Sequence, residues 1–149
     1  MKILVTGAKG FVGQNLVANL KNIQQGKNRT RPALKIDEIY EYDITSTQQE
    51  LETYCGFAST LLDTLKKHGN TCPVMLASSI QATLIGRYGE SDYGKSKLAG
   101  EELFFAYAKE TGAQVLVYRF PNLFGKWCRP NYNSVIATFC NNIANDLPI

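Results

Sequence analysis

Residues 2–13 read Lys-Ile-Leu-Val-Thr-Gly-Ala-Lys-Gly-Phe-Val-Gly, and the architecture of the chain can be inferred outward from them. Residues 2–6 are a short apolar run that leads into a glycine, which is typical of a buried parallel strand. From Phe11 onward apolar side chains recur at helical spacing, and this helix is predicted to end near Gly26. The stretch therefore predicts a strand, a glycine loop and a helix.

The loop has the spacing Gly7-x-x-Gly10-x-x-Gly13. In a dinucleotide-binding turn the first glycine permits the tight turn, the second lets pyrophosphate approach the backbone, and the third lets helix and strand pack closely. The phosphates would then meet the N–H groups at the start of the helix. An ordinary glycine-rich turn is the alternative. The candidate cofactor-binding residues of this loop are Gly7, Lys9, Gly10, Phe11, Val12 and Gly13.

The rest of the chain alternates between strand and helix patterns. With residues 2–6, the predicted strands are 38–44, 73–78 and 114–120, and the predicted helices are 47–54, 57–68, 91–111 and 134–145. Gly112 is expected to end the long helix 91–111. Such alternation predicts an α/β fold with a parallel sheet, in which ligands bind beyond the carboxyl ends of the strands.

An acidic residue at the end of the second strand commonly holds the adenosine ribose of a bound dinucleotide. Asp43 has this position, thirty residues beyond Gly13, because a basic connector intervenes. A carboxylate there disfavours the 2′-phosphate of NADP. The connector, residues 27–35, precedes the strand and is expected at the opposite edge of the sheet, where a solvated loop is the simpler interpretation.

Two further features indicate proton transfer. Ser78 and Ser79 stand at the end of a buried strand, and Tyr93 and Lys97 are one helical turn apart, so they share a helix face. A phenol has a pKa near 10, and a nearby ammonium is expected to lower it by stabilising the phenolate. A tyrosine and a lysine on a surface helix are the alternative, since Tyr-x-x-x-Lys alone is common.

With Thr6-Gly7-Ala8-Lys9-Gly10-Phe11-Val12-Gly13 and Tyr93-x-x-x-Lys97, the chain resembles the extended short-chain dehydrogenases/reductases, the NAD-dependent epimerase/dehydratase family. The resemblance implies a doubly wound Rossmann-like sheet. It also implies that Tyr93 exchanges the carbonyl proton, Lys97 holds the nicotinamide ribose, and Ser79 orients the substrate oxygen. Ser78 and Pro121 are implied cofactor contacts, and Asn122 belongs to the Arg-x-x-Asn segment of the family, which follows a strand.

Residues 79–83 and 121–133 carry a closer resemblance, to the reductase half of capsular polysaccharide biosynthesis proteins that end in a cupin. It implies nicotinamide-dependent reduction of a 4-keto group on a UDP-linked deoxy sugar, with NADPH the usual cofactor. Asp43 argues instead for NAD, and the choice between NAD and NADP remains open. The implied substrate contacts are Ser79, Asn122, Trp127 and Asn133, although Trp127 is equally explained as a core aromatic. A homodimer is also expected by resemblance.

The sequence departs from this family in two places. The cupin and the C-terminal substrate region are absent, so residues 1–149 are expected to form a single NAD(P)-binding domain. Between Cys55 and Phe57 roughly 20–25 residues seen in the family pattern are missing, and they include a central strand of the doubly wound sheet. Without that strand, either another strand closes the gap in the sheet, or a partner chain supplies one, or the fold is compromised. We expect weak cofactor affinity and little turnover from this chain alone.

The composition and the residue spacing argue against several classes of function. A net charge of +3 without a clustered basic face does not indicate nucleic acid, and no apolar run approaches the length of a membrane span. The four cysteines lack metal-ligand spacing and there is a single histidine, so no metal site is predicted, and reduced thiols in a cytoplasmic protein are expected. A Rossmann-like module that binds NAD(P) without catalysis remains the alternative function.

Overall fold

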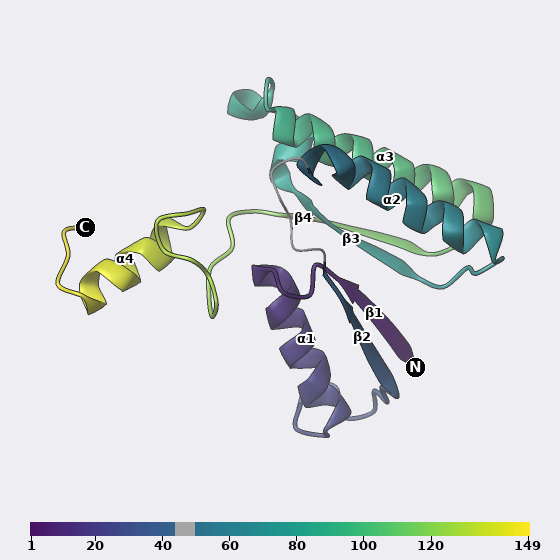
Figure 1. Ribbon diagram of the computed structural model, residues 1–149, viewed down its shortest axis with the longest axis horizontal. Helices are drawn as coiled ribbons and strands as arrows, with labels where there is room; N and C mark the ends of the chain where they lie inside the picture. The colour runs from purple at the N-terminus through teal and green to yellow at the C-terminus, as the bar shows by residue number, and fades with distance from the viewer. Residues whose placement is uncertain (44–49) are drawn as a thin grey trace. The chain divides into compact units, whose positions relative to one another are not determined.

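The computed structural model describes residues 1–43 and 50–149, without the side chains of Tyr42 and residues 50–57. The chain forms two compact units, one of residues 1–45 and 122–149 and one of residues 46–121. Helices and strands alternate from the N-terminus (Figure 1). The elements are β1 (Lys2–Thr6), α1 (Phe11–Gln24), β2 (Glu38–Tyr42), α2 (Glu50–Lys67), β3 (Val74–Ser79), α3 (Asp92–Thr111), β4 (Val115–Phe120) and α4 (Val135–Ala144), with short 3₁₀ helices η1 (Ile80–Thr83) and η2 (Gly86–Tyr88).

In the first unit β1 and β2 pair in parallel, from Lys2 opposite Glu38 to Thr6 opposite Tyr42. Helix α1 packs against this pair and closes a small apolar core, to which Val5, Val17 and Leu20 contribute. The parallel pairing follows from the intervening helix, since a strand–helix–strand connection returns the chain in the same direction. The carboxyl ends of both strands therefore lie beside the glycine loop.

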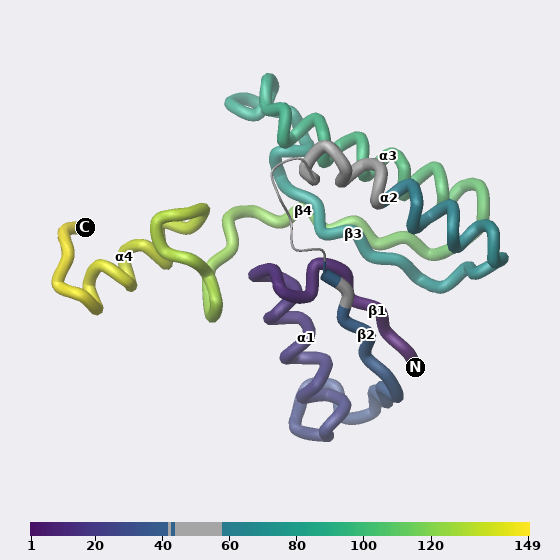
Figure 2. The backbone as a smooth tube through the Cα atoms, in the orientation of Figure 1, coloured from purple at the N-terminus to yellow at the C-terminus, as the bar shows by residue number. Residues whose placement is uncertain are grey.

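The second unit has the same construction. Strands β3 and β4 pair in parallel, from Val74 opposite Val115 to Ser79 opposite Phe120. Helices α2 and α3 run side by side (Figures 1 and 2), and the core that they close contains Leu62, Leu76, Phe104 and Tyr107. The hydroxyl of Tyr107, a fully buried side chain, donates to the carbonyl oxygen of Asn70 at 3.0 Å, so its burial leaves no phenol oxygen unpaired.

The long helix α3 begins and ends where its sequence predicts. The Ser91 hydroxyl caps it by accepting a hydrogen bond from the Gly94 N–H at 3.0 Å. At the other end Gly112 adopts a left-handed backbone with φ of +72°, which a residue with a side chain rarely adopts. In the described part of the chain, no helix has the length and apolar character needed to cross a membrane.

The predicted strands and helices are confirmed, with one correction between β2 and β3. The predicted break at Gly56 is wrong, because α2 runs through it as one helix from Glu50 to Lys67. Glycine lowers helix stability by only about 1 kcal/mol, which packing of the flanking turns can offset. The predicted helix start at residues 47–49 lies outside the described residues. Neither 3₁₀ helix was predicted.

The sheet is incomplete, as predicted. Among the described residues the strands form two separate two-stranded parallel sheets, β1–β2 and β3–β4, instead of one continuous doubly wound sheet. Of the residues that the structure describes between β2 and β3, those in regular structure form the helix α2, whereas the family pattern has an additional strand there. The described residues therefore keep the parallel βα units of a Rossmann-like fold and contain no strand at the place expected for its centre.

Candidate functional site

The glycine loop joins β1 to α1. Gly7 has φ of +65°, and its carbonyl oxygen accepts a hydrogen bond from the Gly10 N–H at 3.0 Å, which closes the turn. Helix α1 begins directly after Gly10, and no side chain caps its first turn. The N–H groups at a helix start have no partner within the helix, so this end suits a phosphate group.

Gly13 shows why the third glycine is needed. A Cβ atom added there would lie 1.9 Å from the Gly7 carbonyl oxygen and 2.8 Å from the Cα of Ala8, far inside contact distance. The same addition at Gly10 would lie 3.3 Å from that oxygen, a much milder approach. The start of α1 is thus packed directly on the loop backbone, which matches the close helix–strand packing predicted from the spacing.

Asp43 lies beside the glycine loop. Its carboxylate, one residue beyond β2, accepts a hydrogen bond from the Lys9 N–H. The side-chain amide of Gln14 donates to the Lys9 carbonyl oxygen, so the loop is held from both sides. The structure therefore brings together the candidate cofactor residues of the loop and the carboxylate predicted to hold a ribose.

Trp127 is placed against α1. The Asn15 side chain donates to the carbonyl oxygens of Phe11 and Lys126, both at 2.9 Å, and this links the two segments. Trp127 lines a shallow cavity of about 250 Å³ together with Ala8, four residues of α1 and Glu41. Its indole is 42% exposed, so it is not the core aromatic that the alternative interpretation required. Its predicted contact with the substrate stays a prediction.

The other residues predicted to line the substrate and cofactor are found in loops. Pro121 and Asn122 directly follow β4, and Asn133 immediately precedes Ser134, the residue that caps α4. Pro121 belongs to the second unit and Asn122 and Asn133 to the first. The predicted roles of these three residues remain predictions.

Ser79, Tyr93 and Lys97 lie close to one another in the second unit. Ser79 is the last residue of β3, and its hydroxyl lies close enough to the Tyr93 phenol to lower the pKa of that phenol. The Nζ atom of Lys97 lies 5.5 Å from the centre of the Tyr93 ring. The strand end and the first turns of α3 thus gather the three side chains that the sequence proposes for proton transfer.

The pKa of Tyr93 differs from the expectation. Partial burial of the ring raises the pKa of the phenol, and this outweighs the hydrogen bond with Ser79, which lowers it. Burial and the Ser79 hydroxyl are the causes of the shift, and the lowering expected from the Lys97 ammonium is not among them. The phenol is consequently protonated at neutral pH and can act as a proton donor.

Ser78 has a hydrogen-bond partner within the chain. Its buried hydroxyl donates to a carboxylate oxygen of Glu101, a side chain that is only 1% exposed. Arg119, near the end of β4, binds the same carboxylate through Nε at 2.9 Å and Nη2 at 2.6 Å. This contact ties α3 to both strands, and the predicted contact of Ser78 with the cofactor stays a prediction.

Sequence reasoning missed Glu101. Its signal was present, because it follows Tyr93 and Lys97 at intervals of four residues and so lies on the same face of α3. The hydrogen bonds from Arg119, with a smaller contribution from Ser78, hold the pKa of Glu101 below its ordinary value, although burial raises it. The carboxylate is therefore ionised at neutral pH and links α3 to β3 and β4.

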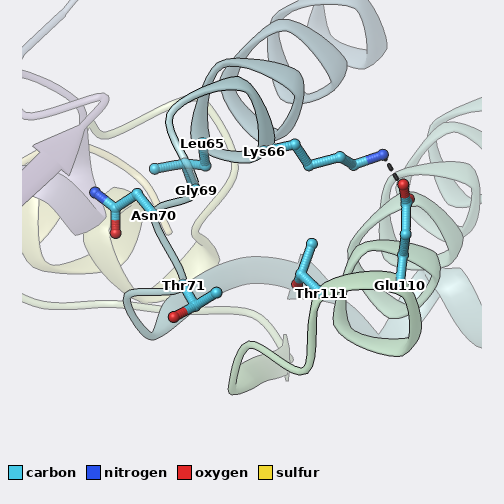
Figure 3. Close-up of a pocket in the computed structure, with 7 residues that line it drawn as sticks. All are labelled: Leu65, Lys66, Gly69, Asn70, Thr71, Glu110 and Thr111. Carbon is cyan, nitrogen blue, oxygen red and sulfur yellow. Dashed lines mark hydrogen bonds and ion pairs between the residues drawn. The ribbon is translucent and has the colours of Figure 1, made fainter.

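A second cavity, of about 330 Å³, lies beside the C-terminal ends of α2 and α3 (Figure 3). The Lys66 ammonium and the Glu110 carboxylate, 2.6 Å apart, span one side of it. Tyr93 lies near the opposite end of α3, about 25 Å away at a rise of 1.5 Å per residue. This cavity is therefore separate from the cluster of Ser79, Tyr93 and Lys97.

The described residues contain no group of three or more histidine, cysteine or acidic side chains placed to hold a metal ion. Cys72, Cys128 and Cys140 are free thiols. The side chain of Cys55 lies outside the described residues.

Comparison with known proteins identifies the family of the chain and several relatives. The model of the NAD dependent epimerase/dehydratase family matches residues 69–149. The UDP-2-acetamido-2,6-beta-L-arabino-hexul-4-ose reductase of Pseudomonas aeruginosa is 36% identical over 164 residues, which cover 100% of this chain and 43% of the reductase. The UDP-glucose 4-epimerase of Vibrio cholerae is 28% identical over 188 residues, 95% of this chain and 57% of the epimerase.

Among solved structures, the capsular polysaccharide assembling protein CapF from Staphylococcus aureus superposes with a TM-score of 0.75 at 38% identity. The match covers 100% of this chain and 43% of CapF, so the chain spans less than half of this relative. The alignment with the reductase runs over 164 residues, 15 more than the chain has, in keeping with the inferred internal deletion. The chain belongs to the NAD dependent epimerase/dehydratase family, and it resembles the UDP-sugar reductase and CapF within that family.

Proposed function

We propose that this chain is the cofactor-binding and proton-transferring part of a reductase that acts on the 4-keto group of a UDP-linked deoxy sugar. The reaction would serve the synthesis of a surface polysaccharide precursor. The observation that carries the proposal is the cluster of Ser79, Tyr93 and Lys97 in a chain of this family. The names of the reductase and of CapF support the substrate class and the pathway.

The glycine loop fits a nicotinamide dinucleotide. Gly13 leaves the loop backbone in contact with the start of α1, and the uncapped first turn offers N–H groups to a pyrophosphate. Asp43, held beside the loop by the Lys9 N–H, would accept hydrogen bonds from the adenosine ribose. Its negative charge would repel a 2′-phosphate, which favours NAD(H) over NADP(H).

Ser79 and Tyr93 would act on the substrate carbonyl. The Ser79 hydroxyl orients the carbonyl oxygen, and the protonated phenol of Tyr93 gives that oxygen its proton. Bound nicotinamide cofactor would supply the hydride for the carbonyl carbon. Lys97, beside the Tyr93 ring, would steady the phenolate left after the transfer and bind the ribose next to the nicotinamide.

Substituting Tyr93 tests this proposal. Tyr93→Phe removes only the transferable proton, so cofactor binding should persist while the weak turnover expected of this chain falls by a factor on the order of 10²–10⁴. Lys97→Ala should reduce both. Binding is followed by the fluorescence of NADH or NADPH, and turnover by its oxidation after a UDP-linked 4-keto sugar is added.

Tyr88→Phe is the matched control. Tyr88 lies in η2, and its hydroxyl is bonded to Arg87 at 2.9 Å, so loss of this hydroxyl should change neither binding nor turnover. Equal loss of cofactor affinity in Tyr93→Phe and Lys97→Ala would contradict the assigned roles. Cofactor binding by the wild-type chain without any hydride transfer would favour a binding module without catalysis.

A further inference from the structure

Gln81 contacts both elements that carry the proton-transfer residues. Its backbone N–H donates to the Ser79 hydroxyl at 3.2 Å, on the strand side. Its side-chain oxygen accepts a hydrogen bond from the Ser91 hydroxyl at 2.8 Å, on the helix side. Gln81 therefore links the end of β3 to the start of α3 through one residue of η1.

Gly94 reinforces this link through close packing. A Cβ atom added at Gly94 would lie 2.4 Å from the Gln81 carbonyl oxygen and 3.1 Å from its carbonyl carbon. The first turn of α3 can approach η1 this closely only because Gly94 has no side chain. The contact involves the backbone on both sides, so a side-chain rotation cannot relieve it.

Ser91 connects Gln81 to the helix turn that contains Tyr93. The Ser91 hydroxyl donates to Gln81 and accepts from the Gly94 N–H, while its carbonyl oxygen accepts from the Lys95 N–H at 2.8 Å. These bonds determine where the first turn of α3 begins, and Tyr93 lies within that turn. The same residue, Gln81, thus anchors both the hydroxyl and the phenol of the proton-transfer pair.

We infer that Gln81 is a positioning residue, which holds the first turn of α3 at the distance from the end of β3 that keeps the Tyr93 phenol near the Ser79 hydroxyl. This inference rests on the proposed function, because it matters only where those two groups act on one carbonyl. Reacting groups displaced by about 1 Å can lose on the order of 10²-fold in rate. Gln81 is bonded both to the end of β3 and to the start of α3, so it opposes such a displacement.

The test compares Gln81→Ala with Gln81→Glu. The alanine variant leaves the Ser91 hydroxyl without its acceptor, whereas a glutamate oxygen can still accept from it. Loss of a hydrogen bond of about 1 kcal/mol should speed amide exchange of Gly94 about fivefold in Gln81→Ala, and Gln81→Glu should restore the protection. Thr111→Ala, which removes hydrogen bonds at the other end of α3, is the matched control and should leave Gly94 unchanged.

A second measurement follows the Tyr93 phenol directly. Burial is the larger cause of its raised pKa, so a loosened first turn should lower that pKa toward the ordinary value of about 10. Titration by NMR with ¹³C-labelled tyrosine reports it, and the spectrum of Tyr93→Phe assigns the signal. The alanine variant should show the shift and Thr111→Ala should not.

The inference fails if Gln81→Ala and Thr111→Ala give the same Gly94 exchange and the same Tyr93 pKa. Neither measurement requires turnover, so this outcome is distinct from failure of the proposed function, which is decided by hydride transfer in the wild-type chain and in Tyr93→Phe. Where turnover is measurable, Gln81→Ala should lower kcat and leave KM nearly unchanged.

Discussion

Replacing Glu101 by glutamine should destabilise the second unit far more than the same change at Glu110. Both residues lie on α3, and each carboxylate is 2.6 Å from a cationic nitrogen, of Arg119 and of Lys66 respectively. The two pairs differ in burial, since the Glu101 side chain is 1% exposed and that of Glu110 is 61% exposed. The comparison therefore separates the effect of burial from the effect of distance.

The expected magnitude follows from the donors that converge on Glu101. The Ser78 hydroxyl and two nitrogens of Arg119 all donate to its oxygens, so a glutamine amide would face at least one of them donor to donor. Breaking a buried pair is destabilising by about 3–5 kcal/mol, and because Arg119 keeps contact with water we expect about 3 kcal/mol. Glu110→Gln, at the surface, should lower the free energy of unfolding by less than about 1 kcal/mol.

Urea unfolding followed by far-ultraviolet circular dichroism measures this difference. With a slope of about 1.5 kcal/mol per molar urea, Glu101→Gln should lower the midpoint by about 2 M and Glu110→Gln by less than about 0.7 M. Amide exchange in β4 gives a local readout in the same unit. Equal midpoints for the two variants would refute the reasoning, because distance alone would then determine the strength of these pairs.

The same carboxylate predicts a dependence on pH. The pKa of Glu101 is lowered in the folded chain, so its contribution to stability is complete above the unfolded pKa of about 4.3 and is lost as pH falls through the lower folded value. The stability difference between the wild-type chain and Glu101→Gln should therefore be constant at neutral pH and shrink below about pH 4. A difference that grew toward acid would have the wrong sign.

Two further predictions concern the first unit. Gly13→Ala, with its Cβ forced to within 1.9 Å of the Gly7 oxygen, should be destabilising by at least about 1–3 kcal/mol and weaken cofactor binding in calorimetry, whereas Gly10→Ala should have the milder effect. Asp43→Asn keeps a hydrogen-bond acceptor but removes the charge, so affinity for NADP(H) relative to NAD(H) should rise roughly tenfold, or about 1.4 kcal/mol. Asp37→Asn, on the other side of β2, is the control, and an equal change there would contradict the assignment of Asp43.

Local patterns in the sequence predicted most of the secondary structure. Ser91 and Gly112 bound α3 as expected, because capping depends on a side chain and a backbone conformation within one turn. The break at Gly56 was predicted on the same local grounds and is wrong, because a single glycine costs a helix only about 1 kcal/mol and does not by itself end it. Local signals thus located the elements but not every boundary.

In the candidate site, too, local sequence signals predicted some features and only the folded structure showed others. Spacing alone placed Tyr93 and Lys97 on one helix face, and the structure adds the Ser79 hydroxyl to that pair. The partner of Ser78 could not be predicted, because Glu101 is distant in sequence and reaches the strand only when α3 packs on it. The direction of the Tyr93 pKa shift was missed for a related reason, since burial is a property of the folded chain.

The order of strands and helices, the glycine loop and the shared helix face of Tyr93 and Lys97 were determined by the sequence itself, because each depends on residue types at short and fixed intervals. The division into two two-stranded sheets, the buried bond between Glu101 and Arg119 and the contact of Gln81 with Gly94 were decided only by the tertiary structure. These features join residues that are distant along the chain. Their energies depend on burial and on distances of a few ångströms, which periodicity does not encode.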